Sequence, residues 1–143
     1  MVGVDLGERR IGVAVSDGTG TLASPRCTIE RRGKDGPHWS ALTAVVEETG
    51  ARRVVVGMPF SLDGRRGPAA RAAQDDADEL ARLLSPRGVA VETFDERLTT
   101  VSAARSLADA GRRGRGQRRR IDEAAATVLL QAWLDAQRER GHG

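Results

Sequence analysis

The sequence predicts one α/β domain, in which three consecutive strands precede an alternation of helices and strands. Residues 2–31 consist of apolar, β-branched runs separated by turn residues at 7–10 and 17–20, which is the pattern of a meander of strands. Beyond residue 36, segments with helical spacing alternate with short apolar runs, which is typical of a sheet covered by helices. The length of 143 residues suits one domain over residues 1–143.

The elements after the meander follow from the spacing of apolar residues and from glycine and proline stops. Gly50 ends the first helix, Pro86 follows the second, and Gly111 closes a short third helix. In chain order we expect a helix over 39–49, a strand over 53–57, a helix over 69–84, a strand over 89–94, a short helix between 99 and 111, and a last helix over 121–137 before a flexible tail at 138–143.

Composition limits the protein classes. No apolar run approaches the roughly 18–20 residues that span a bilayer, and nothing at the start of the chain suggests secretion. The single Cys27 excludes an internal disulfide and predicts a reducing cytoplasm. The sequence pI is about 10.3, and Lys34 is the only lysine among 23 basic residues. This excess of arginine fits either phosphate binding or a GC-rich genome.

Three carboxylates stand where strands end or a helix begins. Asp5 leaves the first apolar strand, Glu96 follows the last strand, and Asp122 opens the last helix beside its apolar stripe. A carboxylate in such apolar sequence is costly unless something binds it. If the first and last strands are near one another, the three acids can converge and bind one or two Mg²⁺ or Mn²⁺ ions. Such ions can activate water for cleavage of a phosphodiester.

Each acid also has a purely structural explanation. Asp5 can form a turn before Gly7, Glu96 can be a solvated acid paired with Arg97, and Asp122 can be a first-turn acid favoured by the helix dipole. The neighbouring acids Asp17, Asp95 and Glu123 are further candidates.

A basic segment precedes the last helix. Residues 111–120 contain six arginines and no acid. The segment can be a solvated connector, or it can capture a phosphate backbone next to the proposed metal site. Because aromatic residues make up only 3% of the chain, we expect it to contact the backbone and shape of a nucleic acid rather than its bases. The predicted nucleic-acid-binding residues are Arg97, Arg112, Arg113, Arg115, Arg118, Arg119 and Arg120.

Other ligand motifs are weak. The loop over 58–68 follows an apolar strand and contains Gly64 and Gly67, so it is either a ligand loop or an ordinary connector. The chain has no cluster of histidine and cysteine that would bind zinc, and no Walker A motif.

Four blocks of sequence resemble one known family. They are Asp5-Leu6-Gly7 with residues 10–17, residues 55–59 with Asp63-Gly64 and Gly67-Pro68, residues 95–100 (Asp-Glu-Arg-Leu-Thr-Thr), and Ile121-Asp122 with Ala124-Ala125 and residues 129–131. In this order they resemble the YqgF family, also called RuvX, whose members are described as Holliday-junction resolvases or pre-16S rRNA nucleases.

The resemblance implies an RNase H-like fold with three layers, a mixed five-stranded sheet whose second strand is antiparallel to its neighbours, and helices on both faces. It implies metal-dependent hydrolysis of phosphodiester bonds, and the family's acidic site matches Asp5, Glu96 and Asp122. It leaves open whether the partner is structured RNA or branched DNA. A junction resolvase is expected to act as a symmetric homodimer, whereas an rRNA-trimming enzyme has no such requirement.

Two other functions remain open from the sequence. Asp5-Leu6-Gly7 before a turn is also found in phosphotransferases that bind nucleotides, but those enzymes close two such domains over ATP, and 143 residues supply one. A nucleic-acid-binding protein without catalysis would need only the basic segment.

Overall fold

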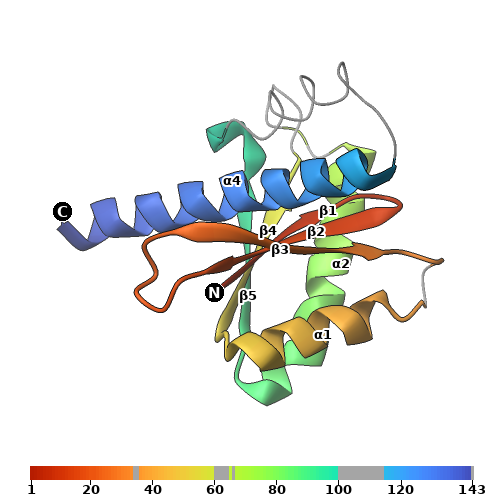
Figure 1. Cartoon of the computed structure of the whole chain (residues 1–143), viewed down its shortest axis with the longest axis horizontal. Helices are drawn as coiled ribbons and strands as arrows, with labels where there is room; N and C mark the ends of the chain where they lie inside the picture. Colours follow the sequence, from red (N-terminus) through yellow and green to blue (C-terminus); the bar gives the residue numbers. More distant parts are fainter. Residues whose placement is uncertain (34–35, 60–64, 66, 100–114, 143) are drawn as a thin grey trace.

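The structure is a computed structural model that describes residues 1–33, 36–59, 65, 67–99 and 115–142. Figure 1 shows a central sheet with helices on both sides. The elements in chain order are β1 (Val2–Leu6), β2 (Arg10–Ser16), β3 (Ala23–Glu30), α1 (His38–Thr49), β4 (Arg53–Met58), α2 (Pro68–Leu84), the 3₁₀ turn η1 (Ser85–Arg87), β5 (Ala90–Asp95), the 3₁₀ turn η2 (Glu96–Leu98) and α4 (Arg115–His142).

The sheet confirms the predicted α/β class. Its strand order is β3-β2-β1-β4-β5, with β2 antiparallel to β1 and β3, and with β1, β4 and β5 parallel. Figure 1 shows α4 above the sheet and α1 below it, and α2 shares the core cluster of α1 and so covers the same face, which is the expected three-layer arrangement. Because β1, β4 and β5 are parallel, their carboxyl ends, with Asp5 and Glu96, lie at one edge of the sheet.

Alternation along each strand decides which residues face which helix layer. Val2 and Val4 belong to the large core cluster with Leu42 of α1 and Leu80 of α2. The residues between them face the opposite side, where the backbone of Gly3 lies against Leu130 of α4. Asp5 continues this second set, so its side chain is directed to the α4 side of the sheet.

The last helix differs from its prediction at both ends. It spans Arg115–His142 rather than 121–137, so the part of the basic segment over 115–120 is helical and not a loop. Residues 138–142, expected to be a flexible tail, continue the same helix. Arginine, glutamine and glutamate are good helix formers, and a lone glycine such as Gly116 costs only about 1 kcal/mol. The short helix expected between 99 and 111 lies almost wholly outside the described residues, as do 60–64 and 66 of the loop.

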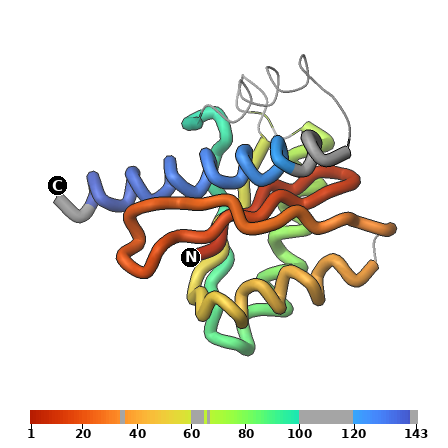
Figure 2. Tube along the Cα trace, in the orientation of Figure 1, coloured from red at the N-terminus to blue at the C-terminus, as the bar shows by residue number. Residues whose placement is uncertain are grey.

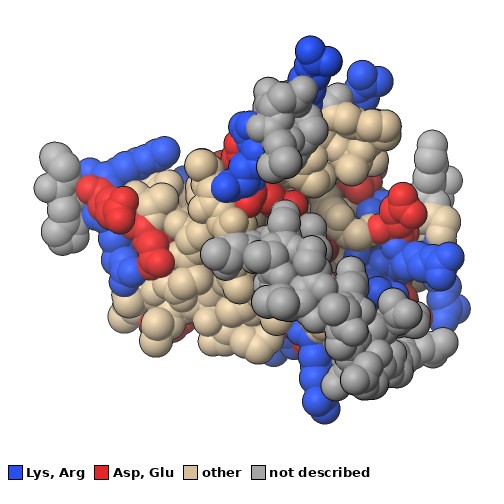
Figure 3. All heavy atoms as spheres, turned by 90° about the horizontal axis from the view of Figure 1, so that it is seen from above, with Lys and Arg blue, Asp and Glu red and all other residues tan. Residues whose placement is uncertain are grey.

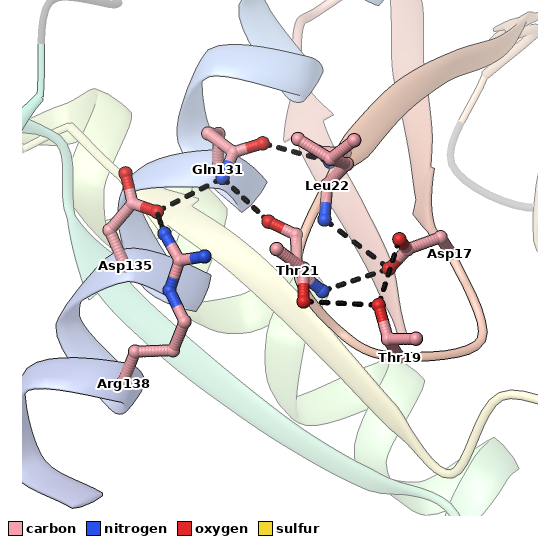
Figure 4. Close-up of polar contacts among 8 residues, drawn as sticks. Asp17, Thr19, Thr21, Leu22, Gln131, Asp135 and Arg138 are labelled. Carbon is pink, nitrogen blue, oxygen red and sulfur yellow. Dashed lines mark hydrogen bonds and ion pairs between the residues drawn. The ribbon is translucent and has the colours of Figure 1, made fainter. Parts of the chain in front are cut away.

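A polar clamp fixes α4 along the β2–β3 hairpin, which runs beside it in Figure 2. Gln131 of α4 accepts a hydrogen bond from the Ala23 backbone N–H (2.9 Å) and donates one to the Thr21 carbonyl (2.9 Å). Asp17 organises the same turn by accepting bonds from the backbone N–H groups of Thr21 (2.8 Å) and Leu22 (3.2 Å), as Figure 4 shows. The clamp ties α4 to the sheet nine residues beyond Asp122 and so limits sliding of the helix.

Two glycines let α4 and η2 approach the sheet closely. A β-carbon on Gly12 would lie 2.0 Å from the Asp122 carbonyl oxygen, and one on Gly57 would lie 2.8 Å from Oε1 of Glu96. Real β-carbons essentially never make contacts this short, so a larger residue would displace the backbone of α4 at Gly12 and the carboxylate of Glu96 at Gly57. Both glycines lie on the α4 side of the sheet, and both lie against an acid predicted from the sequence.

We predict that Gly12→Ala lowers the free energy of unfolding by about 1–3 kcal/mol, the usual cost of inserting a methyl group into packed structure. The atoms in its way belong to the backbone of α4, so the helix must shift at Asp122. Urea denaturation measures the loss. Gly18→Ala is the matched control, because nothing lies within 4 Å of its added methyl group, and equal losses for the two variants would contradict the packing described.

Candidate active site

Asp5 is a buried charged residue at the end of β1. It is 5% exposed and pairs across the sheet with Gly12 of β2. The backbone of Asp122 in α4 packs directly against Gly12 of β2. Since Gly12 is the residue paired with Asp5, Asp122 lies next to Asp5 on the α4 side of the sheet. Two acids that are 117 residues apart in the sequence are therefore brought to adjoining positions on one side of the sheet.

Glu96 reaches the same place from the other direction. It is the first residue of η2, is 5% exposed, and has Oε1 over the backbone of Gly57 in β4. Val56 pairs with Val4 of β1, and Gly57 and Asp5 are the next residues of those two strands. Asp122, Asp5 and Glu96 thus stand over three neighbouring strands, β2, β1 and β4.

Burial changes the acidity of Glu96. It raises the pKa of this carboxyl from 4.5 to about 7, and the negative charge of Asp95 adds to the effect. A glutamate in such surroundings is stabilised by any cation that binds beside it. The pKa of Asp95 moves in the opposite direction, because hydrogen bonds from Arg97 favour its ionised form.

Asp122 has a cationic partner that sequence reasoning missed. Arg10 of β2 donates from Nε to Oδ2 of Asp122 over 2.6 Å. Among the residues that the structure describes, no three acidic, histidine or cysteine side chains form a ready-made metal site. The donor set nevertheless fits a hard divalent cation, because three carboxylates stand on adjoining elements and two of them are buried.

The further acidic candidates lie elsewhere or have other partners. Asp17 follows β2 at the opposite end of the sheet, where the Ser16 backbone N–H bonds to the Met1 carbonyl. Glu123 is near enough to Cys27 of β3 to raise the pKa of its thiol, although burial raises it more. Asp95 is held by Arg97, whose Nη2 lies 2.6 Å from Oδ2.

The predicted nucleic-acid-binding arginines are only partly described. Arg97 follows Glu96 and binds Asp95, Arg120 is exposed on α4, and the backbone of Arg115, Arg118 and Arg119 belongs to the first turns of that helix. Arg112 and Arg113 lie outside the described residues. On the face seen in Figure 3, basic and acidic side chains stand next to one another at several places, so the basic residues visible there do not form one continuous patch.

Arg31 stabilises the turn after Asp5 from the side of the sheet that α1 and α2 cover. Arg31 donates to the Gly7 carbonyl (3.1 Å) and binds Asp76 of α2 through both terminal nitrogens (2.9 and 3.2 Å). Its guanidinium also lies 5.3 Å from the ring centre of Trp39. These contacts join the turn between Asp5 and Arg10 to both helices on the far side of the sheet.

A groove of about 1460 Å³ runs between α1 and α2. Leu6 and Gly7 line one end, but the groove lies below the sheet, whereas the side chain of Asp5 is directed above it. The groove is therefore separate from the candidate active site.

No helix in the described part of the chain has the length and apolarity needed to cross a membrane.

Comparisons with known proteins agree with this fold. A family model described as "RuvX: Holliday junction resolvase" matches residues 1–136. A protein of Mycobacterium sp. (strain KMS), named "Putative pre-16S rRNA nuclease", is 48% identical over 99% of this chain and 87% of the relative. A protein of the same name from Mycobacterium ulcerans (strain Agy99) is 50% identical over 99% of this chain and 82% of the relative.

Solved structures of Thermus thermophilus RuvC share the fold. The protein alone matches with a TM-score of 0.57 at 17% identity, over 97% of each chain. The complex with a Holliday junction substrate matches with a TM-score of 0.58 at 15% identity, over 96% of this chain and 95% of that one. The RNase H-like fold expected from the resemblance is confirmed. Because the family model spans nearly the whole sequence and the curated relatives are about half identical, the chain belongs to the RuvX family.

Proposed function

We propose that this protein is a divalent-metal-dependent endonuclease that hydrolyses phosphodiester bonds of structured nucleic acid, and that it processes the 5′ end of pre-16S rRNA. The placement of Asp5, Glu96 and Asp122 over three neighbouring strands carries the proposal. The names of relatives at 48–50% identity support the substrate.

The three carboxylates would hold one or two Mg²⁺ or Mn²⁺ ions, which when bound lower the pKa of a water ligand and offset charge on the phosphate. The protein contributes position and burial. Asp5 and Glu96 are shielded from water, which strengthens their attraction for a cation. With its pKa near 7, Glu96 is partly protonated at neutral pH and gives up that proton when a cation binds.

Nucleic acid would approach from the side of α4. Arg97 beside Glu96 and the arginines of residues 112–120 are the proposed phosphate contacts. The half-buried thiol of Cys27 suits a reducing compartment, so we propose a cytoplasmic site of action.

The second candidate is resolution of Holliday junctions. The description of the family model and the shared fold with RuvC favour it. A resolvase cuts two strands of a four-way junction, so this function requires a homodimer. Light scattering of the protein with and without a junction would show whether two copies assemble.

One comparison separates the candidates. Wild-type protein and Asp5→Asn are incubated with a 5′-extended 16S rRNA precursor or a four-way DNA junction, each with Mg²⁺ or Mn²⁺. We expect wild type to shorten the precursor and Asp5→Asn to leave it intact. Cleavage of the junction alone would favour the resolvase, and binding of both substrates without cleavage would contradict the nuclease proposal.

A further inference from the structure

Arg10 and Asp122 form an ion pair at the open rim of the candidate site. The Arg10 side chain is 28% exposed and that of Asp122 is 20% exposed, whereas Asp5 and Glu96 are each 5% exposed. Arg10 stands two residues before Gly12 on β2, so both lie on the side of the sheet that α4 covers. A ligand that enters the site from solvent would meet this pair before it reaches the buried acids.

Only one nitrogen of the Arg10 guanidinium is used in the ion pair. Nε donates to Oδ2 of Asp122, and the two terminal nitrogens have no partner among the residues that the structure describes. A guanidinium carries five N–H donors in a rigid plane, four of them on its terminal nitrogens. The Nε contact holds the guanidinium plane in one orientation. The side chain therefore loses less conformational entropy when a ligand binds to its terminal nitrogens.

We propose that Arg10 is a substrate-binding residue that grips the phosphate group bound at this site with its two terminal nitrogens. The inference rests on the proposed function for the identity of the substrate. Paired N–H groups of an arginine match two oxygens of a phosphate, and this bidentate contact is among the strongest that side chains form with phosphate. Asp122 then has two tasks, since one oxygen holds Arg10 and the other remains for a cation.

The neighbouring cation is less suited to this task. Arg97 binds Asp95 through both Nε and Nη2, at 3.0 and 2.6 Å, so one of its two terminal nitrogens is already engaged and a two-point grip on phosphate would have to break that bond. Arg26 is a suitable control residue, because it also forms an ion pair with an acid but lies away from the candidate active site. It binds Glu48 over 2.7 Å on the edge strand β3, and its side chain is 43% exposed.

The test measures nucleic-acid binding without cleavage. In an Asp5→Asn background with Mg²⁺, the dissociation constants of a labelled rRNA precursor and a labelled four-way junction are followed by anisotropy against salt concentration. We expect Arg10→Met to weaken binding about tenfold. It should also reduce the slope of log K against log salt by about 0.7–0.9, the loss of one phosphate contact. Arg26→Met should leave the slope unchanged, and an unchanged slope for Arg10→Met would overturn the proposal.

Two further measurements exclude a merely structural role. Mn²⁺ binding without nucleic acid should stay within about threefold of wild type in Arg10→Met; a large loss with an unchanged salt slope would instead make Arg10 a positioning residue for Asp122. Arg10→Lys keeps the charge but not the planar fork, so it should restore the salt slope without the full affinity. Because none of these assays requires cleavage, failure of the nuclease proposal would remain distinguishable from failure of this one.

Discussion

Asp5→Asn is expected to lower the cleavage rate at least ~10³-fold, the scale of losses seen when one member of a catalytic set is removed. Asp5 is a buried acid at the point where β1, β2 and β4 adjoin, and asparagine keeps its shape while removing its charge. Single-turnover kinetics on the cleaved substrate would measure the loss.

Nucleic-acid binding by the same variant should be unchanged or tighter, because a negative charge near the phosphate has been removed. Asp17→Asn is the matched control, since Asp17 lies at the opposite end of the sheet in a turn of its own. Equal activity of Asp5→Asn and wild type would show that Asp5 is only a structural residue of the turn.

Glu96→Gln is expected to abolish cleavage and to stabilise the metal-free protein at high pH. Burial raises the pKa of Glu96 to about 7, so between pH 4.5 and about 7 the folded state binds more protons at this group than the unfolded state. This group therefore lowers the free energy of unfolding as the pH rises through that window. Glutamine cannot ionise, so the variant should not show this loss in the free energy of unfolding, which is on the order of 3 kcal/mol.

Thermal melts in a chelator measure this difference at pH 4.5 and pH 8. The melting temperature of the variant minus that of wild type should be larger at pH 8 than at pH 4.5. Added Mn²⁺ should raise the melting temperature of wild type more than that of the variant. A difference that does not change with pH would contradict the burial of an ionisable Glu96 in this position.

Much of the fold could be predicted because local signals agree with the tertiary structure. Continuous runs such as Val54 to Val56 form a strand that is buried on both faces, and Gly50, in a left-handed conformation, ends α1 where the sequence indicates. The ends of α1, β4, α2 and β5 differ from the predicted ends by at most one residue.

The start of α4 could not be predicted in this way. A run of arginines with three glycines has the composition of a loop, but arginine itself favours helix, and the long helix is stabilised by packing of its distant half on the sheet. The first turns are therefore helical in spite of Gly116.

Part of the candidate site could be predicted from placement along the chain. The positions of Asp5 and Glu96 after parallel strands indicate a common edge, and the structure agrees. The contact of Arg10 with Asp122 could not be foreseen, because it joins residues 112 positions apart and depends on how α4 lies on Gly12. The only local signal was an arginine that opens a strand next to a glycine turn.

Calorimetric titration with Mn²⁺ in the absence of nucleic acid tests the central claim most directly, which is that Asp5, Glu96 and Asp122 form one metal site. Wild type and the Asp17→Asn control should bind Mn²⁺ alike, and Asp5→Asn and Asp122→Asn should each lose at least about tenfold in affinity. Equal affinities in all four proteins would contradict a shared metal site at these carboxylates.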